Sequence, residues 1–140
     1  MRTPRTYDDR AVHSFDDTPF NRAFRFEMRS RSDGGSEIAL PVASWFEQEY
    51  GIVHGGVISS LADTAAVYSL RGTLGENERM TSVEFKINFL MPATMTGGSL
   101  VARANAVRRG RTIGVCDVDV RQGNELIAKG LFTYLFLGAR

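Results

Sequence analysis

The stretch Tyr50–Arg71 reads YGIVHGGVISSLADTAAVYSLR, and the rest of the chain is organised around it. From Val57 to Leu70 it contains no proline, no glycine and a single charge, Asp63. Its apolar residues recur at the three-to-four-residue spacing of a buried helix face. They are Val57, Ile58, Leu61, Ala62, Ala65 and Ala66. The pattern predicts the central helix of the domain.

Asp63 falls on one flank of this helix, beside the apolar face. The residues that precede it on that flank are small, namely Gly56, Ser59 and Ser60, so another backbone or a ligand has room to approach. Aspartate is a poor helix former, and a carboxylate in apolar surroundings needs a partner or a chemical role. Asp63 is therefore either a solvated charge beside the core or a functional acid.

The sequence His54-Gly55-Gly56 stands at the start of the helix. Backbone N–H groups at a helix start lack intrahelical acceptors and carry the positive end of the dipole, so they can hold an anion or a polarised carbonyl oxygen. A simple turn before a helix is the alternative interpretation. A rise of ~1.5 Å per residue puts Gly55 and Asp63 roughly 12 Å apart, too far to contact one reacting carbon. If they cooperate, they come from two chains related by a two-fold axis.

The remaining segments predict an α+β fold with a mostly antiparallel sheet, in the order β-β-α-β-β-β-β. Residues 1–22 are polar and irregular, and we expect an N-terminal arm whose Phe15 and Phe20 pack on the body or on a neighbouring subunit. Residues 23–140 form the folded domain. The expected strands are Ala23–Arg31, Ser36–Val42, Met80–Leu90, Gly98–Arg109, Thr112–Gln122 and Glu125–Leu137.

Composition narrows the class of protein. With 140 residues, 43% of them hydrophobic, the chain forms one domain with enough apolar material for a core. A net charge of +1 argues against a general nucleic-acid binder. The lone cysteine, Cys116, excludes an internal disulfide and fits a packed strand position. Neither a signal peptide nor a membrane-spanning run is evident, so we expect a cytoplasmic protein without membrane association. His13, His54 and Cys116 lack metal-ligand spacing, and no metal site is expected.

Four motifs together resemble a known family. They are GIVHGGVISSLADTA (51–65), TSVEFKINFLMPA (81–93), GRT (110–112) and AKGLFTYLFL (128–137). In this combination, over roughly Phe24 to Leu137, the chain resembles the hotdog-fold thioesterases of the phenylacetate (PaaI-type) branch, within the 4-hydroxybenzoyl-CoA thioesterase-like superfamily. The resemblance implies a long helix wrapped by an antiparallel sheet. It also implies hydrolysis of aryl- or short- to medium-chain acyl-CoA esters at a homodimer interface, usually within a homotetramer.

The resemblance also implies catalytic roles. The Gly55 N–H, assisted by Gln48 from the preceding loop, would polarise the thioester carbonyl. Asp63 of the opposing chain would act as general base or as nucleophile, and Ser82 would hold the attacking water. Residues that bind substrate would be His54, Gly56, Val57, Thr64, Arg108, Gly110 and Arg111. Coenzyme A is part of the substrate, so no cofactor is expected.

The arginine turn and the class of reaction each allow more than one interpretation. The arginines around Gly110 either grip the phosphates of coenzyme A or are ordinary solvated charges of a turn. For the whole protein, the alternatives are a hotdog hydratase or dehydratase that uses His54 and Asp63 to move protons, and a non-catalytic acyl-CoA-binding module. An acid retained in an apolar helix argues against the binding module. The sequence does not identify the acyl group, because the apolar pocket candidates do not distinguish phenylacetyl from a medium chain.

Overall fold

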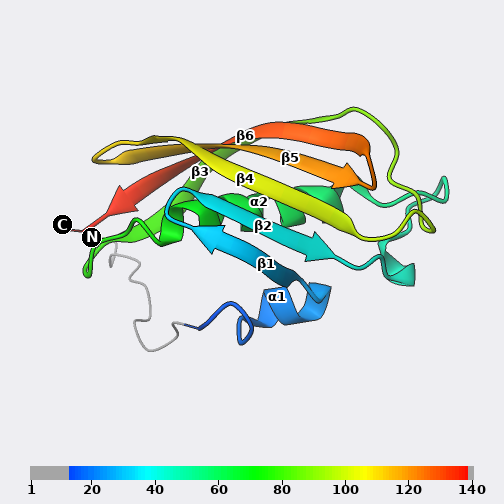
Figure 1. Cartoon of the computed structure of the whole chain (residues 1–140), viewed down its shortest axis with the longest axis horizontal. Helices are drawn as coiled ribbons and strands as arrows, with labels where there is room; N and C mark the ends of the chain where they lie inside the picture. Colours follow the sequence, from blue (N-terminus) through cyan, green and yellow to red (C-terminus); the bar gives the residue numbers. More distant parts are fainter. Residues whose placement is uncertain (1–12, 139–140) are drawn as a thin grey trace, which may run out of the picture.

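A computed structural model describes residues 13–138, and its elements run in the predicted order with one additional short helix (Figure 1). The elements are α1 Pro19–Phe24, β1 Glu27–Ser32, β2 Gly35–Leu40, the 3₁₀ turn η2 Ser44–Phe46, α2 Gly55–Arg71, β3 Arg79–Phe89, β4 Leu100–Arg109, β5 Ile113–Gln122 and β6 Glu125–Leu137. The α+β prediction and the β-β-α-β-β-β-β order are confirmed. The part of the expected N-terminal arm that covers residues 1–12 lies outside the described residues.

The start of the first strand was predicted too early. Ala23 and Phe24 belong to α1, which begins with Pro19 at a position where proline favours a helix. Arg25 ends that helix in the left-handed conformation, with φ of 61°, and β1 begins only at Glu27. Phe15, just before α1, is buried with its ring edge-on to Tyr68 of α2. This segment therefore packs on the central helix of its own chain.

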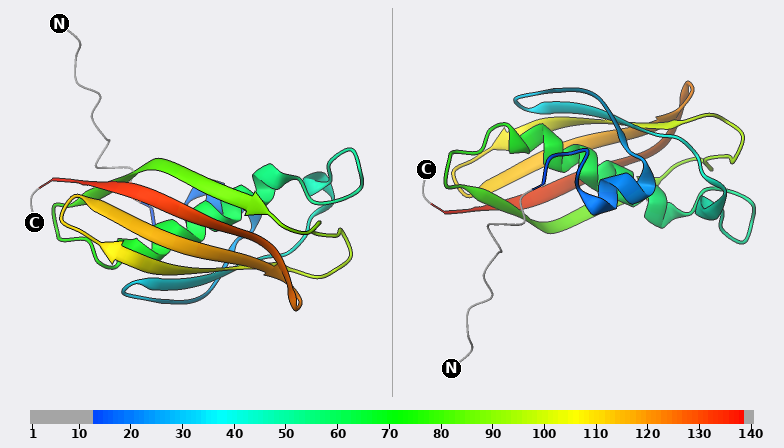
Figure 2. Two further views of the ribbon diagram at one scale, coloured as in Figure 1. Left: turned by 90° about the horizontal axis from the view of Figure 1, so that it is seen from above. Right: turned by 90° about the horizontal axis from the view of Figure 1, so that it is seen from below.

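The six strands form one antiparallel sheet in the order β1-β2-β4-β5-β6-β3. Figure 2 shows α2 lying along one face of this sheet. The helix packs mainly on β2, β4 and β5, so its contact with the edge strand β3 is slight. Within residues 13–138, one flank of α2 beside β3 therefore stays largely open.

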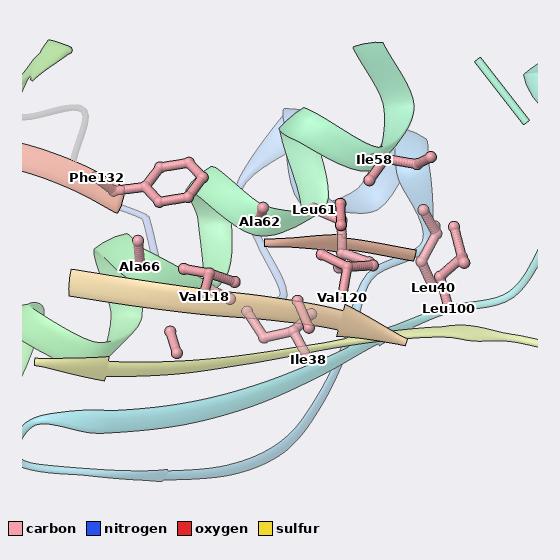
Figure 3. Packing of buried hydrophobic residues seen from close by; sticks show 14 of the residues in the cluster. Ile38, Leu40, Ile58, Leu61, Ala62, Ala66, Leu100, Val118, Val120 and Phe132 are labelled. Atoms are coloured by element: carbon pink, nitrogen blue, oxygen red, sulfur yellow. The ribbon is translucent and has the colours of Figure 1, made fainter. Parts of the chain in front are cut away.

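The core lies between α2 and the inner face of the sheet (Figure 3). Leu61, Ala62 and Ala66 of the helix are fully buried, as the apolar spacing predicted. They face a layer of strand residues composed of Ile38, Leu40, Leu100, Val118, Val120 and Phe132. Alanine on the helix lets the backbone approach the sheet closely, and the Ser36 hydroxyl donates to the Ala65 carbonyl at 2.6 Å. Cys116 is buried in this layer, which confirms the packed-thiol interpretation.

The two edge strands of the sheet differ in character. Strand β1 presents Arg29 and Arg31 to solvent and is interrupted by a bulge, which is how natural sheets protect an edge against pairing. Strand β3 also has a bulge and exposes Glu84 and Lys86, but unlike β1 it exposes large apolar side chains as well, including Val83 at 55% and Phe85 at 45%. Among residues 13–138, no helix has both the length and the apolar character to cross a membrane.

Candidate active site

The start of α2 is held by the side chain of His54. This residue is the N-cap of the helix, and its Nδ1 accepts a hydrogen bond from the Gly56 N–H at 2.8 Å. The His54 carbonyl accepts from the Val57 N–H at 3.0 Å. Within the described part of the chain, the Gly55 N–H has no acceptor. The cap thus satisfies the N–H groups of the two residues that follow Gly55, while the N–H of Gly55 itself stays available.

The loop before the helix places Gln48 beside Gly55. The Gln48 N–H donates to the Ile52 carbonyl at 2.9 Å, and the His54 N–H donates to the Phe46 carbonyl at 2.8 Å, so the loop folds back on the helix start. The Gln48 Oε1 accepts from the Tyr50 N–H. The side-chain NH₂ is the group through which Gln48 can donate a hydrogen bond to a ligand.

A cavity of about 370 Å³ opens at this point, between the loop, the start of α2 and the end of β3. Its walls are formed by Gln48, Ile52, Val53, Gly55, Ile58, Phe89, Leu90, Met91, Pro92 and Ala93. The Phe89 ring lies so near Gly55 that a Cβ there would be 3.2 Å from the ring. A mostly apolar pocket with a few polar groups on one wall is the usual form of a small-molecule site.

Asp63 lies farther along α2 and does not line this cavity. Its half-buried carboxylate accepts a hydrogen bond from the Tyr134 hydroxyl of β6, with 2.5 Å between Oη and Oδ1. The same hydroxyl lies 3.2 Å from the Asp63 carbonyl oxygen. Gly55 and Asp63 are therefore not brought together within one chain, in line with the distance along the helix.

Tyr134 was not identified from the sequence, although a signal exists there. Alternation in β6 turns Tyr134 inward with Phe132 and Phe136, and a buried tyrosine hydroxyl usually has a hydrogen-bond partner. Burial raises the pKa of Tyr134 well above its ordinary value, and the charge and hydrogen bond of Asp63 raise it further. The phenol therefore keeps its proton at neutral pH and acts as a hydrogen-bond donor in the folded protein.

Ser82 lies on β3, directly opposite Tyr134 in the register of β3 and β6. Residues paired across an antiparallel ladder point to the same face, so Ser82 joins Tyr134 on the side of the sheet that carries α2. A bulge follows it, between Ser82 and Glu84. The structure thus gathers Asp63, Tyr134 and Ser82 along the open flank of the helix.

The other predicted substrate-binding residues lie in different places. Val57 is a core residue, only 6% exposed, and the Thr64 hydroxyl donates back to the Ser60 carbonyl at 2.7 Å. Gly56 leaves room for the His54 ring, because a Cβ at this position would be 2.9 Å from the His54 Nδ1 and the ring would have to shift.

The arginine turn between β4 and β5 lies at the other end of α2 from the cavity (Figure 1). Arg109 is occupied there, since it pairs with Glu78 at 2.6 Å and covers the Phe136 ring at 3.6 Å. Arg108 and Arg111 are exposed on either side of Gly110, so they remain the cations of the turn that face solvent. Among residues 13–138, no three His, Cys, Asp or Glu side chains are grouped as a metal site would require.

Comparison with known proteins connects this arrangement to a family. Residues 50–129 match the family described as "Thioesterase superfamily". The "Putative esterase SSO1253" of Saccharolobus solfataricus is 37% identical over 86 residues, which cover 61% of this chain and 55% of that protein, so the chain spans about half of this relative. The "Medium/long-chain acyl-CoA thioesterase YigI" of Salmonella typhimurium is 28% identical over 136 residues, with 84% of each protein covered.

A solved structure shares the fold. The structure of a mutant of the phenylacetic acid degradation protein PaaI from Thermus thermophilus has a TM-score of 0.77 and 24% identity. It covers 84% of this chain and 98% of that one. The resemblance to PaaI-type hotdog proteins that the sequence motifs indicated is therefore confirmed at the level of the fold.

Proposed function

This chain belongs to the thioesterase superfamily, and we propose that it is a cytoplasmic acyl-CoA thioesterase whose active site is completed by a second copy of the chain. One observation carries the proposal. Gly55, whose N–H has no acceptor among residues 13–138, lines an apolar cavity. The carboxylate of Asp63 lies outside that cavity, on a flank of α2 that β3 contacts only slightly.

The edge strand β3 supports the pairing of two chains. Its exposed Val83 and Phe85 lie along the strand between Ser82, which is opposite Tyr134, and Phe89, which lines the cavity. An edge strand with exposed apolar side chains is a template for pairing with another strand. A two-fold axis beside β3 would set two copies of α2 antiparallel and place Asp63 of one copy near Gly55 of the other. Pairs of such dimers would give the tetramer expected from the resemblance.

In the proposed reaction, the Gly55 N–H and the Gln48 side-chain NH₂ stabilise the oxyanion that forms on the thioester carbonyl. Asp63 of the partner removes a proton from water as the water oxygen bonds to the carbonyl carbon, or it attacks that carbon itself and water opens the resulting anhydride. Ser82 would orient the water. The C–S bond then breaks, coenzyme A leaves as a thiolate that takes up a proton, and the free acid remains.

The position of His54 weighs against the hydratase alternative. Its Nδ1 is committed to the Gly56 N–H as the helix cap, so this nitrogen is not available to move protons at a substrate carbon. We assign His54 and Gly56 to shaping the oxyanion site. The exposed Arg108 and Arg111 beside Gly110 are proposed to bind the phosphates of coenzyme A held between the two chains.

Asp63→Asn tests the chemistry. Free thiol release is measured from aryl-, short- and medium-chain acyl-CoA esters with native and variant protein at matched oligomeric state. Since asparagine is nearly isosteric, we expect turnover to fall by about a hundredfold or more while the fold is kept. Binding of these esters without any hydrolysis by native protein would support the binding-module alternative instead.

A pair of substitutions at Gly55 tests the oxyanion donor. Proline is tolerated at the first position of a helix, and the extended conformation of His54 suits a following proline, so Gly55→Pro removes the N–H with little backbone change. Gly55→Ala is the matched control, because it adds the same Cβ beside Phe89 but keeps the N–H. The proline variant should lose about 10²–10³ in turnover relative to the alanine variant.

Mixed dimers test whether the site spans two chains. Asp63→Asn and Gly55→Pro chains with different tags are co-expressed and isolated by sequential capture. In a mixed dimer, one site combines the intact Gly55 of the first chain with the intact Asp63 of the second, so about half of the native activity should return. Activity no higher than that of either variant alone would show that both residues act within one chain.

A further inference from the structure

We propose that Tyr134 is the positioning residue of the acid: its hydroxyl fixes Oδ1 of Asp63 and leaves Oδ2 as the oxygen that meets water or the thioester carbon. The inference rests on the catalytic role proposed above for Asp63. It adds a residue from β6, 71 positions away in sequence, which none of the sequence motifs singled out for the site.

The contact has the geometry of a strong hydrogen bond. A distance of 2.5 Å between Oη and Oδ1 is typical of a hydroxyl that donates to an ionised carboxylate. Burial, together with the adjacent charge of Asp63, raises the pKa of Tyr134 far above its ordinary value, so the hydroxyl keeps its proton throughout the working range of an enzyme. Within residues 13–138, the Asp63 carboxylate has no other hydrogen-bond donor. Oδ2 is therefore the free oxygen.

Tyr134 itself is held firmly in the core. Its side chain is 1% exposed, and its strand is paired on both sides, with Gly114 of β5 and Ser82 of β3 as its cross-strand neighbours. Asp63, in contrast, is half-exposed on a helix flank, where its side chain alone would be free to change rotamer. The hydroxyl of Tyr134, which the sheet holds in place, therefore restricts the carboxylate of Asp63 to one orientation. Displacement of a reacting group by about 1 Å can cost on the order of a hundredfold in rate, which gives such a support its value.

The simpler explanation is that a buried phenol only needs an acceptor and that Asp63 supplies it for stability. The two explanations differ in what the substitution Tyr134→Phe changes. If the contact is only structural, stability falls but the pH dependence of turnover stays as it is. If Tyr134 positions and stabilises the carboxylate, its loss alters the reaction itself.

Steady-state kinetics of Tyr134→Phe provide the test. We expect kcat to fall by about tenfold to a hundredfold while KM stays within about twofold, because substrate binding does not involve the hydroxyl. The acid limb of the kcat/KM profile should move to higher pH, since the carboxylate has lost a donor that favours its charged form. In an Asp63→Asn background, Tyr134→Phe should cause no further loss of turnover.

Tyr68→Phe is the matched control. Tyr68 is also buried but lies on α2. Its hydroxyl accepts a hydrogen bond from Nη1 of Arg71 at 3.3 Å, and its ring contacts Phe15 rather than the site. Its loss should leave kcat and the acid limb unchanged. A native kcat and a native acid limb in Tyr134→Phe, with Asp63→Asn inactive, would overturn the positioning role and leave the proposed function intact. If Asp63→Asn is as active as native protein, the proposed catalytic role of Asp63 is itself contradicted.

A fluorinated tyrosine at position 134 keeps the inference testable if Tyr134→Phe folds poorly. Fluorine makes the phenol a stronger donor with almost no change in shape, so the acid limb should move in the opposite direction, to lower pH. An unchanged acid limb in the fluorinated protein would contradict the inference.

Discussion

At the scale of single residues, the start of α2 depends on two glycines with different tasks. Gly55 supplies an N–H without an acceptor and lies beneath the Phe89 ring, where a side chain would be tight. Gly56 gives its N–H to His54, and a Cβ there would be 2.9 Å from the imidazole Nδ1. The first glycine therefore serves the proposed chemistry, and the second preserves the cap.

We predict that His54→Ala removes the acceptor of the Gly56 N–H and lowers the free energy of unfolding by about 1 kcal/mol, the usual cost of a lost helix cap. Urea denaturation followed by circular dichroism measures this change. His54→Asn, which retains a side-chain acceptor suited to the N-cap, is the control and should lose less. Equal losses for His54→Asn and His54→Ala would show that the cap contributes nothing.

Two raised pKa values predict the behaviour of the protein in alkali. Burial raises the pKa of Tyr134, and burial also raises the pKa of the Cys116 thiol. In both cases the unfolded chain loses its proton before the folded chain does. The contribution of these two groups to the free energy of unfolding is therefore constant at neutral pH. It falls as pH rises, from about pH 9 for the thiol and about pH 10 for the phenol.

Above pH 10, the phenol of Tyr134 lowers the free energy of unfolding by up to about 1.4 kcal/mol per pH unit. Tyr134→Phe removes this contribution, so the decline between pH 10 and 11 should become smaller by about 1 kcal/mol. Urea unfolding at several pH values measures the slope. The same decline in native protein and in the variant would mean that the phenol is not held in its protonated form.

At the scale of elements, a buried ion pair joins the segment after α2 to the end of β4. Arg109 and Glu78 are 2.6 Å apart with side chains 18% and 3% exposed, and the Glu78 carboxylate also accepts from the Gly75 N–H. The exposed pair of Arg103 and Glu37 makes a contact of similar length, 2.8 Å, on the outer face of the sheet. Burial, not distance, separates the two pairs.

Glu78→Gln should accordingly lower the free energy of unfolding by about 3 kcal/mol, because it leaves a largely buried guanidinium without its counter-charge. Glu37→Gln should cost less than about 1 kcal/mol, because solvent screens an exposed pair. Thermal and urea denaturation of both variants provide the comparison. Similar losses at the two positions would refute the dependence on burial.

At the scale of the whole molecule, the asymmetry of the two sheet edges governs the proposed assembly. Strand β1 exposes two arginines and no large apolar side chain, whereas β3 exposes Val83, Phe85 and Phe89 beside the open flank of α2. Because the two halves of the proposed site stand apart in one chain, its activity should depend on whether β3 is paired.

Val83→Lys should therefore produce a folded but inactive monomer, since lysine on an edge strand opposes pairing with another strand. Val107→Lys, at a comparably exposed position on β4 (60% against 55%), should keep the dimer and its thioesterase activity. Sedimentation velocity reports the mass and circular dichroism the fold. A dimeric Val83→Lys protein, or an active monomer, would contradict the shared site.

The pattern of residues along the chain predicted the elements and their order. A period of three to four residues identified α2, alternation identified the strands, and the small residues around Gly55 and Asp63 drew attention to the helix start and its acid. These patterns can be recognised in the sequence because each involves residues that are close together in the chain. The motifs then indicated the family, which comparison confirmed. The misplaced start of β1 was also local, since Pro19 outweighed the alternation of the residues that follow it.

Which residues meet across the sheet depends, in contrast, on the folded arrangement of the strands. Tyr134 reaches Asp63 across 71 positions and Arg109 reaches Glu78 across 31, and no periodicity in the sequence encodes either contact. Their partners are set by strand order and register, which depend on how the whole sheet closes around α2. The open flank of α2 beside β3 is likewise a property of the assembled layers, because a strand becomes an edge only when no other strand of the chain pairs with it.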